Sequence, residues 1–512
     1  LHRACAKDAV SDFLSDVQIR KADFVRFCLK TPEQYQMEEP PMLSFSEILD
    51  VLMKQHDCRA VDICTKLGMS KSYFSRLKKG LILPKNYLLV QELSSALGLP
   101  SHEKQMLINA YKFTKLGEDF LKTESYIEQL YNTQMPELRK DINNINPNPQ
   151  EETINGMENV AEAVAALINN SKHTDCLFIP ENKNFCNLIR EITIKQSDIS
   201  WLIFLENSDK SYFNISVFNE TVSVLLAHQA EARYLYKSVD DYCKCTAFPY
   251  IFIAENEMLM LERNCEKAFR FGSDDFIAAN RRMLRSLFET AKPFVMVLTG
   301  FEEYLENWET VFESADIPNS DDLLIIEKYP CIIHEASYSD ISSHISDTEH
   351  NDRITRTYLE FLKWSAKRLR KQEMLFTTDG IREYFSSETF HEYSKHLTRS
   401  IPKPLRRQLF AKLIEMSKKI DHISPRIMND FPFSEKNIRT INIWKNGILL
   451  IVFDFENAFR IAILQEKTIS SSIRDYFRKL EMCGVILSEK ESIAIMEQEF
   501  HDEVNNLGKE LT

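Results

Sequence analysis

The chain has 512 residues, of which 44% are hydrophobic and 27% are charged, and its net charge is −13. This length predicts two to four domains with sizeable apolar cores. No apolar run is long enough to cross a bilayer, so no membrane segment is expected. The acidic balance excludes a protein that coats nucleic acid over its whole surface. The eleven scattered cysteines are typical of reduced thiols in a cytoplasmic protein.

The N-terminal part of the chain is predicted to be helical. Residues 1–40 form a predicted helical arm that ends at a Pro-Pro pair. A capping box of Ser44 and Glu47 then opens a bundle of short helices. The helices of this bundle are predicted to begin near residue 45, to span 60–67 and 71–79, and to begin again at residues 86 and 101.

The centre of this bundle has the pattern of a helix-turn-helix. Gly68 can take the left-handed conformation that ends a helix sharply, and Ser70 can cap the helix that follows. On that second helix Phe74 and Leu77 share one face, while the remaining positions are Lys, Ser, Tyr and Arg. A narrow apolar seam with a basic, hydroxyl-rich outer face is what reading of the DNA major groove requires.

Charge is distributed unevenly along the chain. Residues 45–100 contain eight Lys or Arg and five Asp or Glu, which is a local charge of +3 and leaves −16 for the remainder. A basic module on an acidic body fits a protein that touches DNA through one domain only. A further helix predicted over 118–138 and an Asn/Pro run at 141–150 separate this module from the rest, and the run is the clearest linker in the chain.

Beyond the linker, short apolar runs alternate with helical segments, which predicts an α/β layer. The predicted strands lie at 176–179, 199–205, 232–236, 250–254, 258–262 and 267–271, and the predicted helices lie at 185–194, 215–227 and 274–290. Residues 350–425 are predicted to be helical and basic, and form either a second nucleic-acid surface or a solvated, salt-bridged face.

A stretch near residue 250 is repeated 190 residues later. Ile251 aligns with Ile441, Asn256 with Asn446, and residues 268–270 with 458–460, giving eight identities over 22 residues without a gap. Each copy pairs two alternating runs across a turn and then enters an amphipathic helix. The pattern favours a duplicated module, although two independent hairpins with common strand residues would also produce it.

The expected architecture is therefore multidomain, with an all-α helix-turn-helix domain followed by a large α/β (α+β) body of two tandem related modules. The expected divisions are a helical arm at 1–40, the helix-turn-helix domain at 41–116, a helix and linker at 117–150, and sensor modules at 151–295 and 296–512, the second with a helical insertion.

Catalytic motifs are not evident in the sequence. There is no glycine-rich phosphate loop and no Gly-x-Ser-x-Gly nucleophile elbow. Cys243, Cys245 and Cys265 are a loose cluster, but zinc needs a second ligand pair that is absent nearby. We therefore expect no catalytic residues, no metal and no cofactor. The rival hypotheses are an enzyme or toxin-like effector whose helix-turn-helix serves autoregulation, and a protein-interaction scaffold.

Residues 44–115 resemble the lambda-repressor-like helix-turn-helix domains of the Cro/xenobiotic-response-element family of bacterial regulators. The resemblance rests on Cys64, on Leu67-Gly68-Met69-Ser70, on Phe74, Leu77 and Gly80, and on Pro84 and Leu93 to Gly98. It implies that Lys71, Ser72 and Ser75 read bases, and that Ser70, Tyr73, Arg76 and Lys79 contact bases or the backbone. Arg59 stands beside Ala60, where the family often has a phosphate-binding Gln, and Lys78 replaces a frequent Glu.

The function expected from this resemblance is that of a cytoplasmic bacterial transcription regulator. It would bind a double-stranded DNA operator as a homodimer, because dimers of this family match pseudo-palindromic sites. The α/β body would sense a small-molecule or peptide effector, and no membrane partner is expected. The aromatic-rich strands near Trp201, Phe252, Trp444 and Phe453 either line an effector pocket or fill cores.

Overall fold

A computed structural model describes the chain in thirteen stretches. They are residues 43–134, 152–191, 198–207, 212–226, 230–300, 303, 321–331, 336–344, 351–386, 400–419, 423–429, 437–455 and 458–510. The chain divides into two compact units, Leu1–Leu121 and Lys122–Thr512. The predicted arm at 1–40 and the predicted linker at 141–150 lie outside the described residues. Among the described helices, none is both long enough and apolar enough to cross a membrane.

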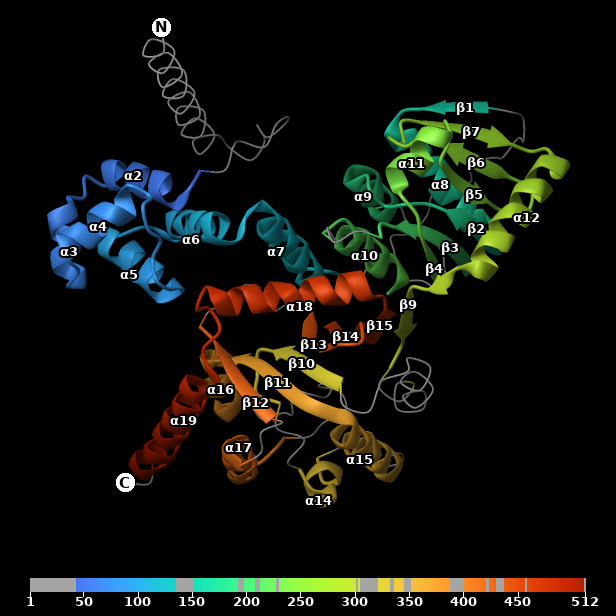
Figure 1. Ribbon diagram of the computed structural model, residues 1–512. Helices are drawn as coiled ribbons and strands as arrows, with labels where there is room; N and C mark the ends of the chain where they lie inside the picture. Colours follow the sequence, from blue (N-terminus) through green and yellow to red (C-terminus); the bar gives the residue numbers. More distant parts are fainter. Residues whose placement is uncertain are drawn as a thin grey trace, which may run out of the picture. The chain divides into compact units, whose positions relative to one another are not determined.

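The described part of the first unit is a bundle of short helices, drawn in blue in Figure 1. These helices are α2 (Phe45–Gln55), α3 (Ala60–Leu67), α4 (Lys71–Lys78), α5 (Tyr87–Leu97) and α6 (Ser101–Leu116). Phe45, Leu49, Leu93 and Tyr111 are at most 1% exposed and form its core. The helical spacing of these apolar residues is the signal that predicts the bundle, and the helix bounds agree with the prediction within one residue.

Local sequence signals set the helix ends of this unit. Gly68 ends α3 with a φ of 61°, in the left-handed region that an L side chain rarely adopts. The side chain of Ser70 accepts a hydrogen bond from the Tyr73 N–H at 3.1 Å and so caps α4. At the start of α2 the Glu47 carboxylate accepts from the Ser44 N–H at 2.9 Å, which confirms the predicted capping box.

Helix α7 (Glu118–Tyr131) ends earlier than the predicted limit at residue 138. The Asn132 side-chain amide donates to the Glu128 carbonyl at 3.0 Å and satisfies one of the last carbonyls of the helix. Pro136 follows soon after, and a proline disfavours helical geometry in the residue before it. The predicted end of this helix at residue 138 was therefore wrong, because it was based on the spacing of the apolar residues and did not take these two stop signals into account.

The first sheet of the second unit is mixed, with strand order β1-β7-β6-β5-β2-β3-β4-β8. Its strands are β1 (Glu152–Asn155), β2 (His173–Leu177), β3 (Asp198–Leu205), β4 (Ala230–Tyr236), β5 (Tyr250–Ile253), β6 (Met258–Leu261), β7 (Lys267–Phe271) and β8 (Lys292–Pro293). Strands β2, β3 and β4 are parallel, whereas β5, β6 and β7 form an antiparallel meander that joins β2 through β5.

Helices cover this first sheet. They are α8 (Met157–Asn170), α9 (Lys183–Glu191), α10 (Tyr212–Leu225), α11 (Val239–Cys245) and α12 (Asp274–Thr290). Helices α8, α9 and α10 contact one another in series, and α12 packs on β2 and β3. Strand β3 reads as an almost continuous apolar run because helices shield both faces of the parallel part. The strands and helices predicted for this region lie within three residues of their observed bounds.

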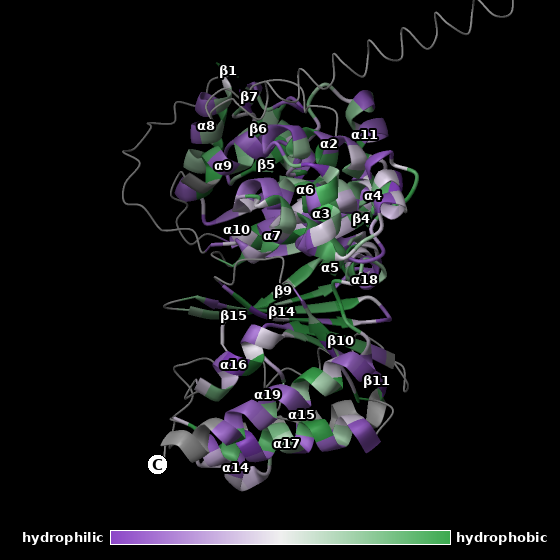
Figure 2. Ribbon diagram, turned by 90° about the vertical axis from the view of Figure 1, so that its left-hand side faces the viewer, coloured by the Kyte–Doolittle hydropathy of each residue, from purple (hydrophilic) through white to green (hydrophobic). Residues whose placement is uncertain are grey.

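The second sheet has strand order β12-β11-β10-β13-β14-β15-β9. Its strands are β9 (Val295–Leu298), β10 (Asp321–Glu327), β11 (Leu369–Thr377), β12 (Ile423–Met428), β13 (Ile438–Trp444), β14 (Ile448–Phe455) and β15 (Ala458–Gln465). Its helices are α14 (Tyr338–Ser342), α15 (Asn351–Arg368), α16 (Thr378–Ser386), α17 (Lys403–Lys419), α18 (Lys467–Met482) and α19 (Glu489–Glu510). Figure 2 shows β14 and β15 mostly in green, in keeping with their burial.

One segment of the predicted basic helical insertion is a strand. Residues 369–377 form β11, which lies between the parallel strands β10 and β12. Its first half is mostly polar and half-buried, with only Arg370 exposed, whereas Met374, Leu375 and Phe376 are at most 2% exposed. Several basic residues of this region are in ion pairs, such as Arg370, whose Nε lies 2.9 Å from Asp322 Oδ1, and Arg407, whose Nε lies 3.1 Å from Glu503 Oε1.

The two sheets share a strand order. In each sheet, three parallel strands lie side by side, and the first of them in the chain also pairs with an antiparallel meander. A strand that precedes the parallel strands in the chain pairs with the far edge of that meander. Each meander is followed by a helix, α12 or α18. The second meander is longer, because β14 and β15 each span eight residues whereas β6 and β7 span four and five.

Candidate nucleic-acid interface

Helix α4 presents one face to its own unit and another to solvent. Phe74 and Leu77 are 1% and 0% exposed, and α4 packs against α2 and α3. The opposite face carries Lys71, Ser72, Ser75 and Arg76, and all four side chains are exposed. The apolar seam is narrow because only positions 74 and 77, three residues apart, point inward. The polar face of α4 is therefore displayed by the packing of the bundle.

Three of the predicted cationic contacts have no ion-pair or hydrogen-bond partner for their side chains within the described part of the chain. No ion pair or hydrogen bond joins the side chains of Lys71, Arg76 or Lys79 to another described residue, and all three are exposed. Lys79 follows the last residue of α4, so it extends the cationic face beyond the helix. Cationic side chains that are held on a short helix and not neutralised by neighbours are suited to contact phosphates or base edges.

Two other predicted cations are already paired. Arg59 Nε lies 3.0 Å from Asp62 Oδ2 at the exposed start of α3. Lys78 Nζ lies 3.1 Å from Asp50 Oδ1 on α2. Lys78 therefore fastens α4 to α2, a structural role that the helix-turn-helix pattern does not reveal. Both residues remain predictions as DNA contacts, and each would have to exchange its carboxylate partner for a phosphate.

The two remaining predicted contacts differ in exposure. Ser70 is exposed, and its hydroxyl oxygen is used as the cap of α4, which leaves its proton able to donate. Tyr73 is half-buried on the flank of the helix. Lys85 is not among the predicted contacts. It is exposed and directly precedes Asn86, the N-cap of α5, so it places one more cation near a helix N-terminus.

The Asp50 carboxylate is held in its charged form by two ammonium groups. Burial alone would raise its pKa, but hydrogen bonds and charges from Lys54 and Lys78 outweigh burial and hold the pKa below its ordinary value. The distances are 2.7 Å to Lys54 Nζ and 3.1 Å to Lys78 Nζ. Because the pKa is lower in the folded state, the pairs stabilise the fold above the pKa of the unfolded chain, and this contribution is lost as the pH falls through the folded-state pKa.

We expect Asp50→Asn to lower the stability of the first unit by about 0.2–1 kcal/mol at pH 7, since one side of each pair is well exposed. The difference between the variant and the wild type should be smaller near pH 3 than at pH 7, because below the ordinary aspartate pKa the contribution of the ion pairs to stability declines. Urea denaturation of both proteins at the two pH values measures this. A destabilisation of equal size at both would mean that the ion pairs do not cause it.

The candidate metal cluster does not assemble. Among the described residues, no group of three His, Cys, Asp or Glu side chains could hold a metal ion. Cys265 is buried at 0% exposure and Cys245 is exposed, so the two thiols have different surroundings. Burial raises the pKa of the Cys243 thiol, and Glu181 and Asp240 raise it further against the opposing effect of Arg263. This thiol therefore stays protonated at neutral pH, unlike an activated nucleophile.

Comparison with known proteins adds little to this geometry. No family model and no curated protein matches the chain. A solved structure of TrmBL2, described as an archaeal chromatin protein with a novel mode of DNA binding, is similar over 38% of this chain and 71% of its own, with 12% sequence identity and a TM-score of 0.21. A likeness at this level carries no argument about the fold or the function of this chain.

Proposed function

We propose that this chain is a sequence-specific DNA-binding regulator whose first unit docks α4 into the major groove of an operator. The observation that carries the proposal is the outward face of α4, where Lys71, Ser72, Ser75 and Arg76 are exposed beside the buried Phe74 and Leu77. In the proposed complex with DNA, Lys71 donates to guanine acceptors, and the serine hydroxyls contact bases or phosphates. Arg76 and Lys79 neutralise phosphates and give the binding its salt dependence.

A single helix of this length offers few contacts. Helix α4 has eight residues and is therefore about 12 Å long, so it can reach only a few base pairs. We therefore propose that two copies of the chain bind adjacent half-sites about 34 Å apart, as dimeric helix-turn-helix proteins do. We also propose that the chain is a member of the Cro/xenobiotic-response-element family and that it binds DNA as a dimer.

The second unit is proposed to be a duplicated sensing body. The support is the common strand order of its two sheets, together with the identities 190 residues apart in the sequence. The first predicted candidate for an effector pocket, the aromatic strands, is occupied by packing: Trp201, Phe252, Trp444 and Phe453 are at most 5% exposed. These aromatic side chains thus lie in the sheet cores, where Trp201 and Phe252 also line an apolar cavity of about 50 Å³.

The test is selection from a pool of random-sequence duplexes. Repeated retention on the purified full-length chain, followed by sequencing, should enrich a two-fold symmetric motif. Footprinting on the enriched duplex should then protect two major-groove patches about one helical turn apart. Enrichment of no motif, together with binding that depends only on salt, would contradict sequence-specific recognition.

A further inference from the structure

A buried cavity lies between the first sheet of the second unit and the helices α8, α9 and α10. Its volume is about 50 Å³. On the sheet side it is lined by Trp201 of β3, Cys176 of β2 and Phe252 of β5, which are directly paired across three neighbouring strands. The adjacent Asp175 lies on the other face of the sheet, where α12 brings Arg281 Nε to 3.5 Å from its carboxylate. The row of three paired side chains therefore faces α8, α9 and α10, which supply the opposite wall.

Aromatic rings make up much of the cavity wall. Phe178 follows β2, and its ring centroid lies 6.3 Å from that of Trp201 and 5.6 Å from that of Phe252. The Trp201 indole N–H donates to the Phe178 carbonyl at 2.8 Å, so this donor is already used within the protein. The three rings therefore offer a ligand apolar surface and π electrons, which attract alkyl groups and cations.

One acidic residue lines the helical side of the cavity. It is Glu220 of α10, which is 7% exposed. Among the described residues that line the cavity, none is Lys, Arg or His. Burial raises the pKa of the Cys176 thiol, which is therefore uncharged at neutral pH. An anionic ligand would meet a like charge without a compensating cation, whereas a cation gains from both the carboxylate and the rings.

The size of the cavity limits what it can hold. A water molecule needs about 10–15 Å³ of such space, so there is room for about three to five non-hydrogen atoms. This size excludes nucleotides, sugars and peptides. An alkylated ammonium ion suits both the size and the walls, because its alkyl groups bury apolar surface while its charge is attracted by the rings and by Glu220.

We propose that this cavity binds a compact alkylammonium ion of about four or five non-hydrogen atoms, with its alkyl groups against Trp201 and Phe252 and its charge next to Glu220. The proposal deepens the sensing role proposed for the second unit, because it names the chemical class of the effector. It rests on that role for the consequence of binding and not for binding itself. An empty cavity lowers stability in proportion to its volume, so a ligand that fills this one should stabilise the fold.

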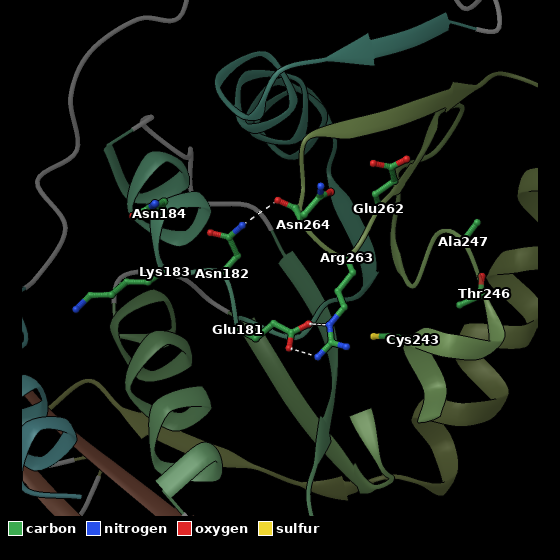
Figure 3. A pocket seen from close by; sticks show the side chains of 10 residues that line it. All are labelled: Glu181, Asn182, Lys183, Asn184, Cys243, Thr246, Ala247, Glu262, Arg263 and Asn264. Carbon is green, nitrogen blue, oxygen red and sulfur yellow. Dashed lines mark hydrogen bonds and ion pairs between the residues drawn. The ribbon is translucent and has the colours of Figure 1, made fainter. Parts of the chain in front are cut away.

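A wider polar cleft of about 780 Å³ lies where β2 and β6 end, and its polar groups are bonded to one another. Arg263 Nε and Nη2 each lie 2.8 Å from one oxygen of Glu181, as Figure 3 shows, and Arg263 Nη1 lies 2.7 Å from Asp240. The Asn182 amide donates to the Asn264 carbonyl at 2.9 Å. A ligand in this cleft would have to compete with these bonds, which favours the smaller cavity as the effector site.

Helix α10 connects the cavity with α7. The residue before Glu220 is Asn219, whose amide donates to the Tyr126 carbonyl of α7 at 2.6 Å. At the start of α10, the ring of Tyr212 lies 5.5 Å from Lys122 Nζ of α7. A ligand that shifts α10 would therefore also move α7, which is continuous in sequence with the helix-turn-helix unit.

The binding test needs no DNA. We expect tetramethylammonium chloride, added at about 10 mM to the full-length chain at constant total salt, to raise its thermal midpoint by about 2 °C or more. The neutral tert-butanol has the same number of non-hydrogen atoms, and tetrabutylammonium has the charge but is too large for the cavity. Neither should raise the midpoint at the same concentration.

Two variants test the site from opposite sides. Glu220→Gln keeps the shape of the side chain and removes its charge, so it should weaken tetramethylammonium binding about tenfold or more in calorimetric titration. Val224→Met lengthens another lining side chain of α10, so it should fill the cavity and abolish binding. Glu289→Gln and Val504→Met make the same changes at exposed sites outside the cavity and should leave binding unchanged.

The outcomes separate this proposal from the proposed function. The cavity assignment is overturned, even if the chain binds DNA, if tetramethylammonium gives no shift or if tert-butanol gives an equal one. It is also overturned if neither Glu220→Gln nor Val224→Met weakens binding more than its control. Tetramethylammonium binding by a chain that selects no DNA motif would support the cavity and contradict only the proposed function.

The connection through α10 has its own test. At constant total salt, tetramethylammonium should change the affinity for a selected duplex about fivefold or more. Asn219→Ala removes the hydrogen bond to the Tyr126 carbonyl, so it should reduce that change while the ligand and the duplex each still bind. An undiminished change in this variant would refute the route through α10.

Discussion

Lys71→Glu combined with Arg76→Glu should weaken binding to a selected operator duplex by at least about 100-fold at physiological salt. Each substitution removes a cation from the exposed face of α4 and places a carboxylate against the phosphates. The slope of log affinity against log salt should also become shallower by about two for each bound α4, because fewer counterions are released. Fluorescence anisotropy over a salt series measures both quantities.

The folded state should survive this double reversal. Both side chains are exposed and neither is paired with another described residue. A glutamate at position 71, the first residue of α4, is favoured by the helix dipole, whereas one at position 76, in its last turn, is disfavoured by about 0.3–1 kcal/mol. An unchanged far-ultraviolet circular dichroism spectrum would confirm that any loss of binding is local to the interface.

A matched control changes the same total charge elsewhere. Arg282→Glu with Lys292→Glu alters two exposed cations of the second unit, so the overall net charge falls by the same amount. Binding should then decline only slightly, through the long-range field. If the control lowers affinity as much as the α4 variant, or if the α4 variant binds with an unchanged salt slope, α4 is not the reading helix.

The helical bundle could be predicted closely because its signals are local. A glycine in the left-handed region at Gly68, the cap at Ser70 and the apolar pair Phe74 and Leu77 each act within a few residues of the chain. The exposure of the outer face of α4 follows from the same spacing. The Lys78–Asp50 pair could not be predicted, because its partner is 28 residues away and only packing of α4 on α2 brings the two together.

Two features of the sheets could not be predicted from such local signals. Strand β11 was missed because its first half is mostly polar, although its place between β10 and β12 leaves only Arg370 exposed. The ion pairs of Arg263 with Glu181 and Asp240 were missed as well, because Glu181 follows β2, Asp240 lies in α11 and Arg263 lies between β6 and β7. No spacing along the chain marks residues that meet only at a common sheet edge.

Gly380→Ala should destabilise the second unit by about 3 kcal/mol, a large effect for one methyl group. Gly380 lies in the first turn of α16, and an added Cβ would lie 1.8 Å from the Lys328 carbonyl oxygen and 2.6 Å from its carbon. That carbonyl cannot simply move away, because it accepts a hydrogen bond from the Thr377 N–H at 3.1 Å. The methyl group must therefore force α16 away from the end of β10, where the second sheet is buried.

Differential scanning calorimetry of the full-length chain measures this loss, with Gly300→Ala as the matched control. No atom lies within 4 Å of a Cβ built at Gly300, so the same chemical change there meets no obstacle and should leave the thermal midpoint within about 1 °C. Because Gly380 lies in the second unit, far along the chain from α4, the variant should still bind a selected duplex below its lowered midpoint. A Gly380→Ala protein as stable as the control would contradict the close approach of α16 to Lys328, and with it the packing at this edge of the second sheet.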